Sequence, residues 1–197
     1  MGMEFYGESY RGNDEPIFVG IPTFLKLPWI KSLEELKKVK PDIAIIGEPF
    51  DFGTTIRPGA RYGPRAIRAA STVPSPPYEH FNIETGVDPF GVFRTVDYGD
   101  VVVSPGDVIE SHTRMTNKVK EVLDIDGIPV MLGGDHSITF ANVRAFAKKY
   151  KNIGMIHIDT HADCAPQGLC GFKYDHGAHI RRIMELGCLK GKNYTLI

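Results

Sequence analysis

The sequence contains little cysteine, almost no excess of either charge and no long apolar run. Three cysteines without Cys-x-x-Cys spacing give weak support to a disulfide framework or a structural zinc site. The 23 Lys and Arg residues against 24 Asp and Glu residues leave a net charge of -1, which disfavours binding to nucleic acid or to an anionic membrane. No stretch approaches the roughly 18 consecutive apolar residues that span a bilayer. We therefore expect a cytoplasmic protein with no nucleic-acid partner and no membrane partner.

The composition is typical of a globular protein of one domain. Of the 197 residues, 42% are hydrophobic and 24% are charged, which excludes disorder as the main state. Residues 1–30 are rich in glycine, proline and aromatic residues, and they show no sustained periodicity. We interpret them as an N-terminal arm that lies over the domain formed by residues 31–197.

Short apolar runs alternate with helical patterns from residue 32 onward. Ser32 and Glu35 form a capping box at the start of a short helix. The runs typical of strands are 43–47, 93–97, 129–132, 153–158 and 194–197, and the further helical patterns are 64–70, 107–123 and 139–150. Strands that alternate with helices predict a parallel sheet with helices on both faces.

Polar motifs follow three of the predicted strands, at residues 48–63, 133–137 and 159–163. In open parallel sheets, ligand sites form at the carboxyl ends of the strands. We therefore expect these three segments to meet at one edge of the sheet and to carry the chemistry of the protein.

The segment Asp159-Thr160-His161-Ala162-Asp163 places ligand-type side chains two residues apart. In an extended strand end such residues project to one side, so the two carboxylates and the imidazole are expected to converge. Carboxylate and imidazole without thiolate suit a divalent ion such as Mn²⁺, Zn²⁺, Fe²⁺ or Ni²⁺. Taken alone, the same segment also fits a solvated turn.

His136 lies in the sequence Gly-Gly-Asp-His-Ser at the neighbouring strand end, where it is expected to supply another imidazole. We expect Asp135 to hydrogen-bond to that imidazole and to orient it. The position of His157 in a strand predicts a place behind the ligands or in the core, and His179 is expected to be exposed or to cap a helix. Taken alone, the Gly-Gly-Asp-His-Ser motif fits an ordinary turn with a helix cap at Ser137. The two motifs together favour a metal site.

Residues 133–137 and 157–163, taken together, resemble the paired metal signatures of the ureohydrolase family, which includes arginase and agmatinase. Residues 47–51 and 59–68 are similar to the first loop and helix of the agmatinase branch. The resemblance implies a three-layer α/β/α fold with a mainly parallel sheet, of which residues 31–197 are the N-terminal portion. It also implies assembly into a homo-oligomer, a trimer or a hexamer.

The resemblance further implies a reaction and the residues that carry it. Two Mn²⁺ ions would activate a bridging water, with His136 and Asp163 binding one ion, His161 the other and Asp159 both. The resulting hydroxide would attack the guanidinium carbon of a small molecule, which then releases urea and an amine. His176 matches the loop histidine that the family uses for proton shuttling, and it would be the catalytic acid–base group.

Agmatine is the substrate that the resemblance favours, and guanidinobutyrate, guanidinopropionate and guanidine share its reacting group. Residues 165–172 lack the Asn and Ser with which arginases hold an amino-acid head group, so arginine is disfavoured. Two alternatives stay open. One is a single-zinc deacylase of the related deacetylase type, and the other is an inactive fragment or pseudoenzyme that keeps the scaffold.

The sequence departs from the family pattern at its end. It stops before the family's Asp-x-Asp signature on a later strand, and four protein groups cannot fill the about five or six positions around each of two ions. We therefore expect a C-terminally truncated chain that by itself binds metal weakly and turns over little substrate.

Overall fold

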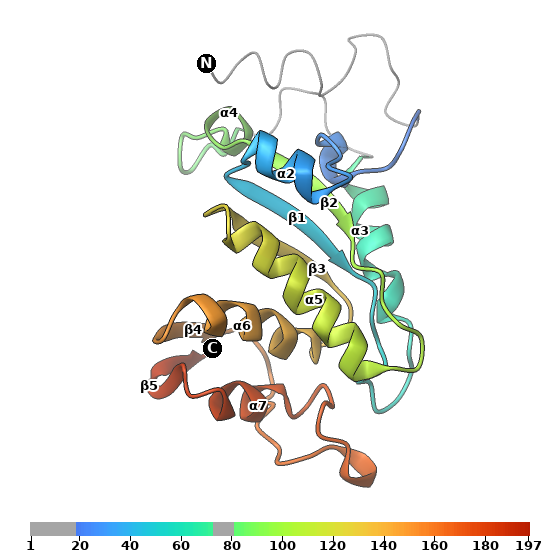
Figure 1. Ribbon diagram of the computed structural model, residues 1–197, viewed down its shortest axis with the longest axis vertical. Helices are drawn as coiled ribbons and strands as arrows, with labels where there is room; N and C mark the ends of the chain where they lie inside the picture. Colours follow the sequence, from blue (N-terminus) through green and yellow to red (C-terminus); the bar gives the residue numbers. More distant parts are fainter. Residues whose placement is uncertain (1–18, 73–80) are drawn as a thin grey trace.

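The computed structural model of the chain describes residues 19–72 and 81–197 (Figure 1). The first 18 residues of the predicted arm therefore lie outside the described residues. The remainder of the arm lies against strand β2 (Thr95–Asp100), where Leu27 and Ile30 are buried and Trp29 forms a parallel bridge with the strand. In the two described ranges, the structure contains no helix whose length and apolar character would let it cross a membrane.

The first three strands form a parallel sheet in the order β2-β1-β3. They are β1 (Ile43–Glu48), β2 (Thr95–Asp100) and β3 (Ile128–Gly133). β1 is the central strand, and its apolar side chains Ala44, Ile45 and Ile46 are buried, as expected for an apolar run that is covered on both faces. The parallel strands and the helices between them confirm the predicted α/β class.

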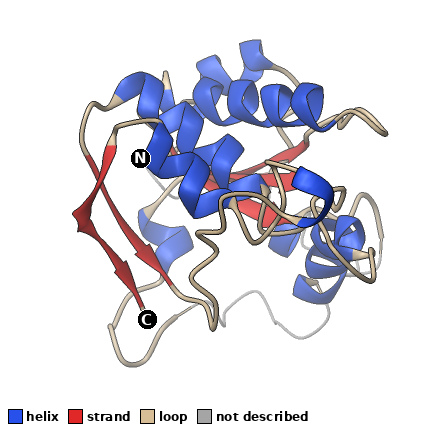
Figure 2. Cartoon of the chain, turned by 90° about the horizontal axis from the view of Figure 1, so that it is seen from below, coloured by secondary structure: helices blue, strands red, loops and turns tan. Residues whose placement is uncertain are grey.

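The last two strands, β4 (Ile153–His157) and β5 (Leu189–Leu196), form a separate parallel pair. Figure 2 shows this pair to one side of the three-stranded sheet. Within the described residues no ladder joins β3 to β4, so the two groups of strands do not form one continuous sheet. Residue alternation selects the buried face of a strand, but it does not select the partner strand.

The described residues contain six α-helices, and those over the predicted patterns 64–70, 107–123 and 139–150 begin and end close to the expected positions. The six helices are α2 (Leu33–Val39), α3 (Gly63–Ser71), α4 (Pro89–Val92), α5 (Val108–Leu123), α6 (Ile138–Lys149) and α7 (His179–Glu185), with 3-10 helices at Phe24–Lys26, Ala60–Tyr62 and Leu169–Gly171. The predicted capping box is present in part. The Glu35 N–H donates to the Ser32 hydroxyl over 3.2 Å, but the Glu35 carboxylate accepts from the Lys31 N–H over 2.7 Å.

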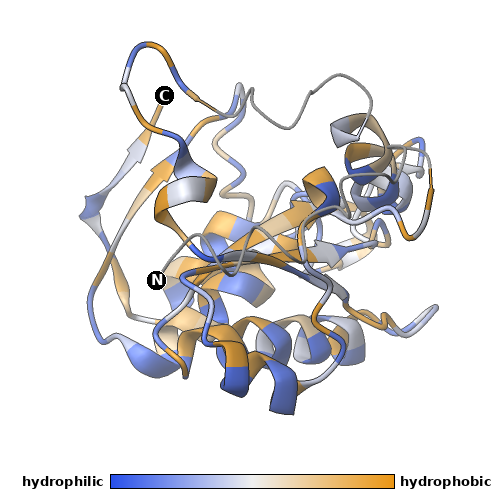
Figure 3. Cartoon of the chain, turned by 90° about the horizontal axis from the view of Figure 1, so that it is seen from above, coloured by the Kyte–Doolittle hydropathy of each residue, from blue (hydrophilic) through white to orange (hydrophobic). Residues whose placement is uncertain are grey.

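The main core lies between the three-stranded sheet and helices α5 and α6. Ile46 and Val96 from the strands pack with Met115, Val119 and Ala141 from the helices, and all five side chains are fully buried. A second apolar cluster joins α6, α7 and β5 through Phe140, Ile180, Ile183 and Leu189. Figure 3 shows the apolar character of the strands at the centre of the molecule. Helix α6 contributes to both cores, and it thereby positions the β4–β5 pair beside the sheet.

A buried carboxyl group ends strand β1. Glu48 is fully buried, and its Oε2 accepts a hydrogen bond from Asn142 Nδ2 over 2.9 Å. Its Oε1 has no hydrogen-bond partner among the described residues. Burial disfavours the charged form and raises the pKa of Glu48 from 4.5 to about 8. The folded protein therefore holds Glu48 neutral at pH 7, whereas the unfolded chain ionises it.

Glu48→Gln is expected to flatten the pH dependence of stability. Because the pKa is raised by folding, the contribution of Glu48 to stability is complete below pH 4.5 and is lost as the pH rises towards about 8. The free energy of unfolding of the parent should fall relative to the variant by up to about 1.4 kcal/mol per pH unit in this window. Urea unfolding between about pH 5 and pH 8 measures the difference. Glu84→Gln, at an exposed position, is the control, and parallel curves for Glu48→Gln and the parent would contradict the prediction.

Candidate metal centre

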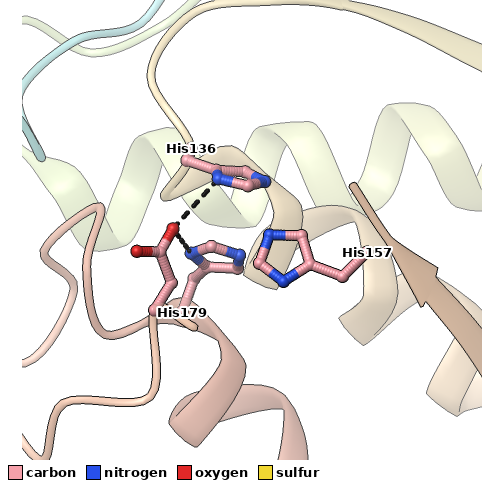
Figure 4. Close-up of side chains that lie close together, drawn as sticks. His136, His157 and His179 are labelled. Atoms are coloured by element: carbon pink, nitrogen blue, oxygen red, sulfur yellow. Dashed lines mark ion pairs between the residues drawn. The ribbon is translucent and has the colours of Figure 1, made fainter. Parts of the chain in front are cut away.

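Four side chains from separate segments meet beside the carboxyl ends of β3 and β4 (Figure 4). His136 follows β3, His157 is the last residue of β4, Asp163 lies in the loop after β4, and His179 is the first residue of α7. One ligand atom of each lies within 4.8 Å of those of the other three. We call this group the four-residue cluster.

His136 lies close to Asp159 and to the other members of the cluster. Its Nδ1 lies 3.0 Å from Asp159 Oδ2 and 3.0 Å from Asp163 Oδ2. Its ring centroid lies 4.0 Å from that of His179 and 5.0 Å from that of His157. The structure therefore brings together three of the four residues that the sequence predicts as metal ligands: His136, Asp159 and Asp163.

The fourth predicted ligand, His161, lies at the surface. Its side chain is 77% exposed, and its Nδ1 lies 3.6 Å from Asp159 Oδ1. Strand β4 ends at His157, so the alternation that predicts convergence does not extend to residues 159–163. These residues follow a loop path, with a φ of 45° at Asp163. The loop carries the Asp163 carboxylate to His136 and leaves the His161 ring outside the four-residue cluster.

The other two histidines of the cluster are almost completely buried. His157 is 3% exposed and His179 is 1% exposed, so the exposed position expected for His179 is wrong. The His179 Nδ1 lies 2.8 Å from the His176 carbonyl oxygen, and the His157 Nδ1 lies 2.7 Å from the Tyr194 hydroxyl. The Nε2 atoms of both rings are buried and have no hydrogen-bond partner among the described residues.

The surroundings of the cluster favour the protonation states that bind metal. Burial lowers the pKa of His179 to about 4, so the ring is neutral at pH 7, as a metal-binding imidazole must be. The His161 backbone N–H donates to Asp159 over 2.9 Å, and this hydrogen bond lowers the pKa of the Asp159 carboxyl. Asp159 is therefore a carboxylate at pH 7.

Asp135 has a different position from the one expected. Its Oδ2 accepts from the Gly53 N–H and its Oδ1 from the Ser137 N–H, both over 2.8 Å. In the described part of the chain, this carboxylate makes no hydrogen bond to His136, because successive side chains of the turn point in different directions. Asp135 instead joins the loop after β1 to the start of α6, and its burial raises the pKa of its carboxyl.

His176, the predicted proton shuttle, lies in the loop before α7 and outside the four-residue cluster. Its Nε2 lies 2.9 Å from the Thr55 hydroxyl, and its backbone N–H donates to the Gly53 carbonyl over 3.0 Å. These two contacts join the loop before α7 to the loop after β1. The half-buried imidazole of His176 is therefore held against the loop after β1.

Three side chains of this site were not predicted from the sequence: His179, Tyr194 and Thr55. His179 carries no spacing signal, because it is the first residue of α7 and His176 lies in the loop before the helix, where the i,i+3 rule does not apply. Tyr194 and Thr55 carry no signal either, because a single hydroxyl residue in a strand or a loop is common.

The donor set of the cluster fits a divalent metal ion. Three imidazoles and a carboxylate, with a second carboxylate at Asp159, are ligands of Zn²⁺, Mn²⁺, Fe²⁺ and Ni²⁺. The buried Nε2 atoms of His157 and His179 lack the partner that a buried polar atom ordinarily has. A bound ion would provide that partner.

Known proteins are similar to this chain in sequence. A protein-family model described as the arginase family matches residues 41–197. A guanidinobutyrase of Pseudomonas aeruginosa is 38% identical over 174 residues, which are 88% of this chain and 52% of the relative. The mitochondrial agmatinase of Gallus gallus is 37% identical over 171 residues, which are 87% of this chain and 47% of the relative. The chain thus spans about half the length of the curated relatives it matches.

Solved structures share the fold. The proclavaminate amidino hydrolase of Streptomyces clavuligerus superposes with a TM-score of 0.78 at 30% identity, over 93% of this chain and 57% of that one. A hypothetical agmatinase from Burkholderia thailandensis gives a TM-score of 0.80 at 28% identity, over 96% of this chain and 57% of that one. These likenesses confirm the predicted arginase-like α/β fold.

Proposed function

Because the chain belongs to the arginase family, we propose that it hydrolyses the guanidino group of a small molecule to urea and an amine. The observation that supports this reaction is the meeting of His136, Asp159 and Asp163 beside the ends of β3 and β4. Similar proteins are named guanidinobutyrase, agmatinase and guanidinopropionase. Agmatine or a similar guanidino compound is therefore the proposed substrate.

We propose Mn²⁺ as the metal, with two ions in the complete site and Ni²⁺, Fe²⁺ or Zn²⁺ as alternatives. His136, Asp159, His161 and Asp163 are the proposed ligands. When bound, such ions lower the pKa of water and so supply a nucleophile at neutral pH. Asp159, whose pKa is lowered, contributes the negative charge that holds the ions.

The proposed role of His176 is to deliver a proton to the departing nitrogen. An amine leaves as a stable neutral molecule only if its nitrogen gains a proton during cleavage. The Thr55 hydroxyl, 2.9 Å from His176 Nε2, holds the imidazole in place. An imidazole nitrogen can both accept this proton and return it.

His176→Gln is expected to lower kcat by about 10²–10⁴-fold, the contribution typical of a general acid. The amount of bound metal should stay unchanged, because His176 lies outside the four-residue cluster. Urea release and elemental analysis of the same samples measure the two quantities. Lys173→Gln, an exposed change in the same loop, is the control. A kcat for His176→Gln equal to that of the control would reject the proton-transfer role.

The reaction is tested with the Mn²⁺-loaded protein and a panel of agmatine, guanidinobutyrate, guanidinopropionate and arginine. We expect urea from one of the first three compounds and none from arginine, because residues 165–172 lack the Asn and Ser that hold an amino-acid head group. Protein that holds metal but releases no urea from any compound would reject the proposal. The rate also tests the expectation that this chain turns over little substrate.

A single-zinc deacylase is the second candidate, and the four-residue cluster favours it in one respect, because its four ligand atoms all lie within 4.8 Å of one another. It predicts one zinc ion per chain and hydrolysis of an amide instead of a guanidino compound. Elemental analysis combined with an amide substrate distinguishes the two reactions. An inactive scaffold would hydrolyse neither substrate.

A further inference from the structure

We propose that Arg144, His112 and Tyr174 form a binding site for one small oxyanion, which is a carboxylate or a phosphate-type group. The three side chains come from α6, from α5 and from the loop before α7, and the two helices pack together (Figure 1). None of the three belongs to the four-residue cluster of the metal centre. The proposal therefore stands independently of the proposed function.

Arg144 is a half-buried cation that is only partly satisfied. Its Nε donates to the Thr116 hydroxyl over 2.9 Å, and its Cζ lies 5.4 Å from the centre of the Phe140 ring. A guanidinium group has five N–H donors in a planar fork. In the described part of the chain, the N–H groups on Nη1 and Nη2 have no acceptor, and the guanidinium has no ion-pair partner. Four donors of one cation are thus free for a ligand.

The elements around Arg144 supply no counter-ion. Helix α6 contains basic residues but no acidic residue. The acidic residues within α5 are Glu110, which pairs with Arg114, and Glu121, which accepts from the Tyr98 hydroxyl. Asp175, in the loop before α7, accepts a main-chain N–H over 2.8 Å. A partly buried charge without a partner is unfavourable, so an anion at Arg144 is expected to be stabilising.

His112 is a second group that lacks a partner beside Arg144. It is 1% exposed, and neither of its ring nitrogens has a hydrogen-bond partner among residues 19–72 and 81–197. Its position four residues before Thr116 places its ring one helical turn from the hydroxyl that holds Arg144. Burial and, to a smaller extent, the charge of Arg144 lower the pKa of His112 to about 4. The ring is therefore neutral at pH 7, with one N–H that needs an acceptor.

Tyr174 closes the site on the side of the loop before α7. Its ring centroid lies 5.7 Å from that of His112 and 5.5 Å from that of Phe140. Its hydroxyl is close enough to interact with the charge of Arg144, and an O–H group can donate to the same anion. The rings of Phe140 and Tyr174 keep water from part of the guanidinium, which strengthens a hydrogen bond to an anion.

The donor set matches the chemistry of an oxyanion. An arginine fork binds carboxylate and phosphate groups through parallel N–H···O contacts. Each oxygen of such a group has more than one lone pair, so one anion can accept from Arg144, His112 and Tyr174 together. The half-buried Arg144 gives the anion access from solvent, whereas the His112 imidazole lies behind it in the core.

The test is a calorimetric titration of the metal-loaded protein with sodium sulfate and, separately, with sodium acetate, while chloride holds the ionic strength constant. Sulfate represents a phosphate-type group and acetate a carboxylate. We expect at least one of the two to bind, with one anion per chain. Arg144→Met should lower its affinity at least about 10-fold, since a hydrogen bond between charged groups contributes about that factor. Arg114→Met is the matched control, because Arg114 lies on α5 and pairs with Glu110, and it should bind the anion like the parent.

The imidazole of His112 gives an independent signal. Its ¹⁵N resonances, identified with His112→Phe, should shift when the anion binds to the parent and should not shift in Arg144→Met. Asp163→Asn should bind the anion like the parent, because Asp163 lies in the metal centre. Loss of binding in Asp163→Asn would place the anion on the metal and overturn the proposal, while the proposed hydrolase function would stand.

Two further outcomes would overturn the site. A parent that binds neither sulfate nor acetate does so without any need for a variant, and so do equal affinities of Arg144→Met and Arg114→Met. Sedimentation of the same samples tests a different source of the counter-ion. Self-association that Arg144→Met abolishes, in a parent that binds neither anion, would assign the counter-ion to a carboxylate of a second copy of the chain.

Discussion

Replacing Asp163 with Asn is expected to lower metal affinity by more than about 100-fold, since losing a ligand costs more than losing a ligand's hydrogen-bond partner. Asp163 belongs both to the ligands predicted from the sequence and to the four-residue cluster, so the result does not depend on which set is correct. Its Oδ2 lies 3.0 Å from His136 Nδ1 and 3.5 Å from His179 Nδ1. Asn has nearly the same shape but lacks the charge that a divalent ion requires.

The backbone should tolerate this substitution. Asp163 has a φ of 45°, a left-handed conformation that Asn adopts readily. The hydrogen bond from the Ile180 N–H to the Asp163 carbonyl, 3.1 Å long, involves only main-chain atoms and is retained. The loop path and the start of α7 are therefore preserved, and the expected effect comes from the lost carboxylate.

Isothermal titration with Mn²⁺ measures the affinity, and urea release measures the activity. Asp126→Asn is a matched control, because Asp126 also has a positive φ, of 61°, but its side chain is 89% exposed and pairs with Lys149. The control should bind Mn²⁺ like the parent. Asp163→Asn affinity within tenfold of the parent would show that this carboxylate is not a ligand in either set.

Arg68→Met is expected to destabilise the fold by about 3–5 kcal/mol, the effect of removing one partner of a buried ion pair. Arg68 is 7% exposed and Asp97 is 1% exposed. The Arg68 Nε and Nη2 donate to the two carboxylate oxygens of Asp97 over 2.7 and 2.9 Å, and Nη1 pairs with Asp100. These contacts join α3 to β2, and without the guanidinium the Asp97 charge stays buried without its counter-ion.

Urea unfolding of the parent and of the variant measures this difference. Lys120→Ala, which removes an exposed pair with Asp124 one helical turn away, should change stability by no more than about 0.5 kcal/mol. Adding Asp97→Asn to Arg68→Met should recover part of the loss, because the remaining side chain then carries no charge. A loss below about 1 kcal/mol for Arg68→Met would mean that Asp97 is satisfied without Arg68, for example by the Phe24 and Gly99 N–H groups.

The two substitutions test different parts of the molecule. The Arg68–Asp97 pair holds α3 to the sheet, whereas Asp163 lies in a loop that forms the metal centre. Arg68→Met should therefore lower stability, whereas Asp163→Asn should lower metal affinity and leave the unfolding of the metal-free protein nearly unchanged. Samples of both variants compared at the same Mn²⁺ concentration distinguish these effects, because a bound ion adds to apparent stability.

Local sequence patterns were enough to predict the order of the elements and the segments that form the site. The apolar run 43–47, the helix that begins after Ser32 and the helix at 107–123 depend on local periodicity and capping, which neighbouring residues decide. Motifs 133–137 and 159–163 follow strands, and parallel strands bring their carboxyl ends to one side. The meeting of His136 with Asp159 and Asp163 therefore needed no long-range information beyond the fold class.

Contacts between distant segments set which side chains enter the cluster and which strands pair. The loop after β4 leaves the regular alternation, so His161 lies at the surface, while α7 packs against α6 and buries His179. β4 pairs with β5 and not with β3. These outcomes depend on contacts between segments far apart in the chain. The residues next to a side chain in the sequence do not determine which distant segment it contacts.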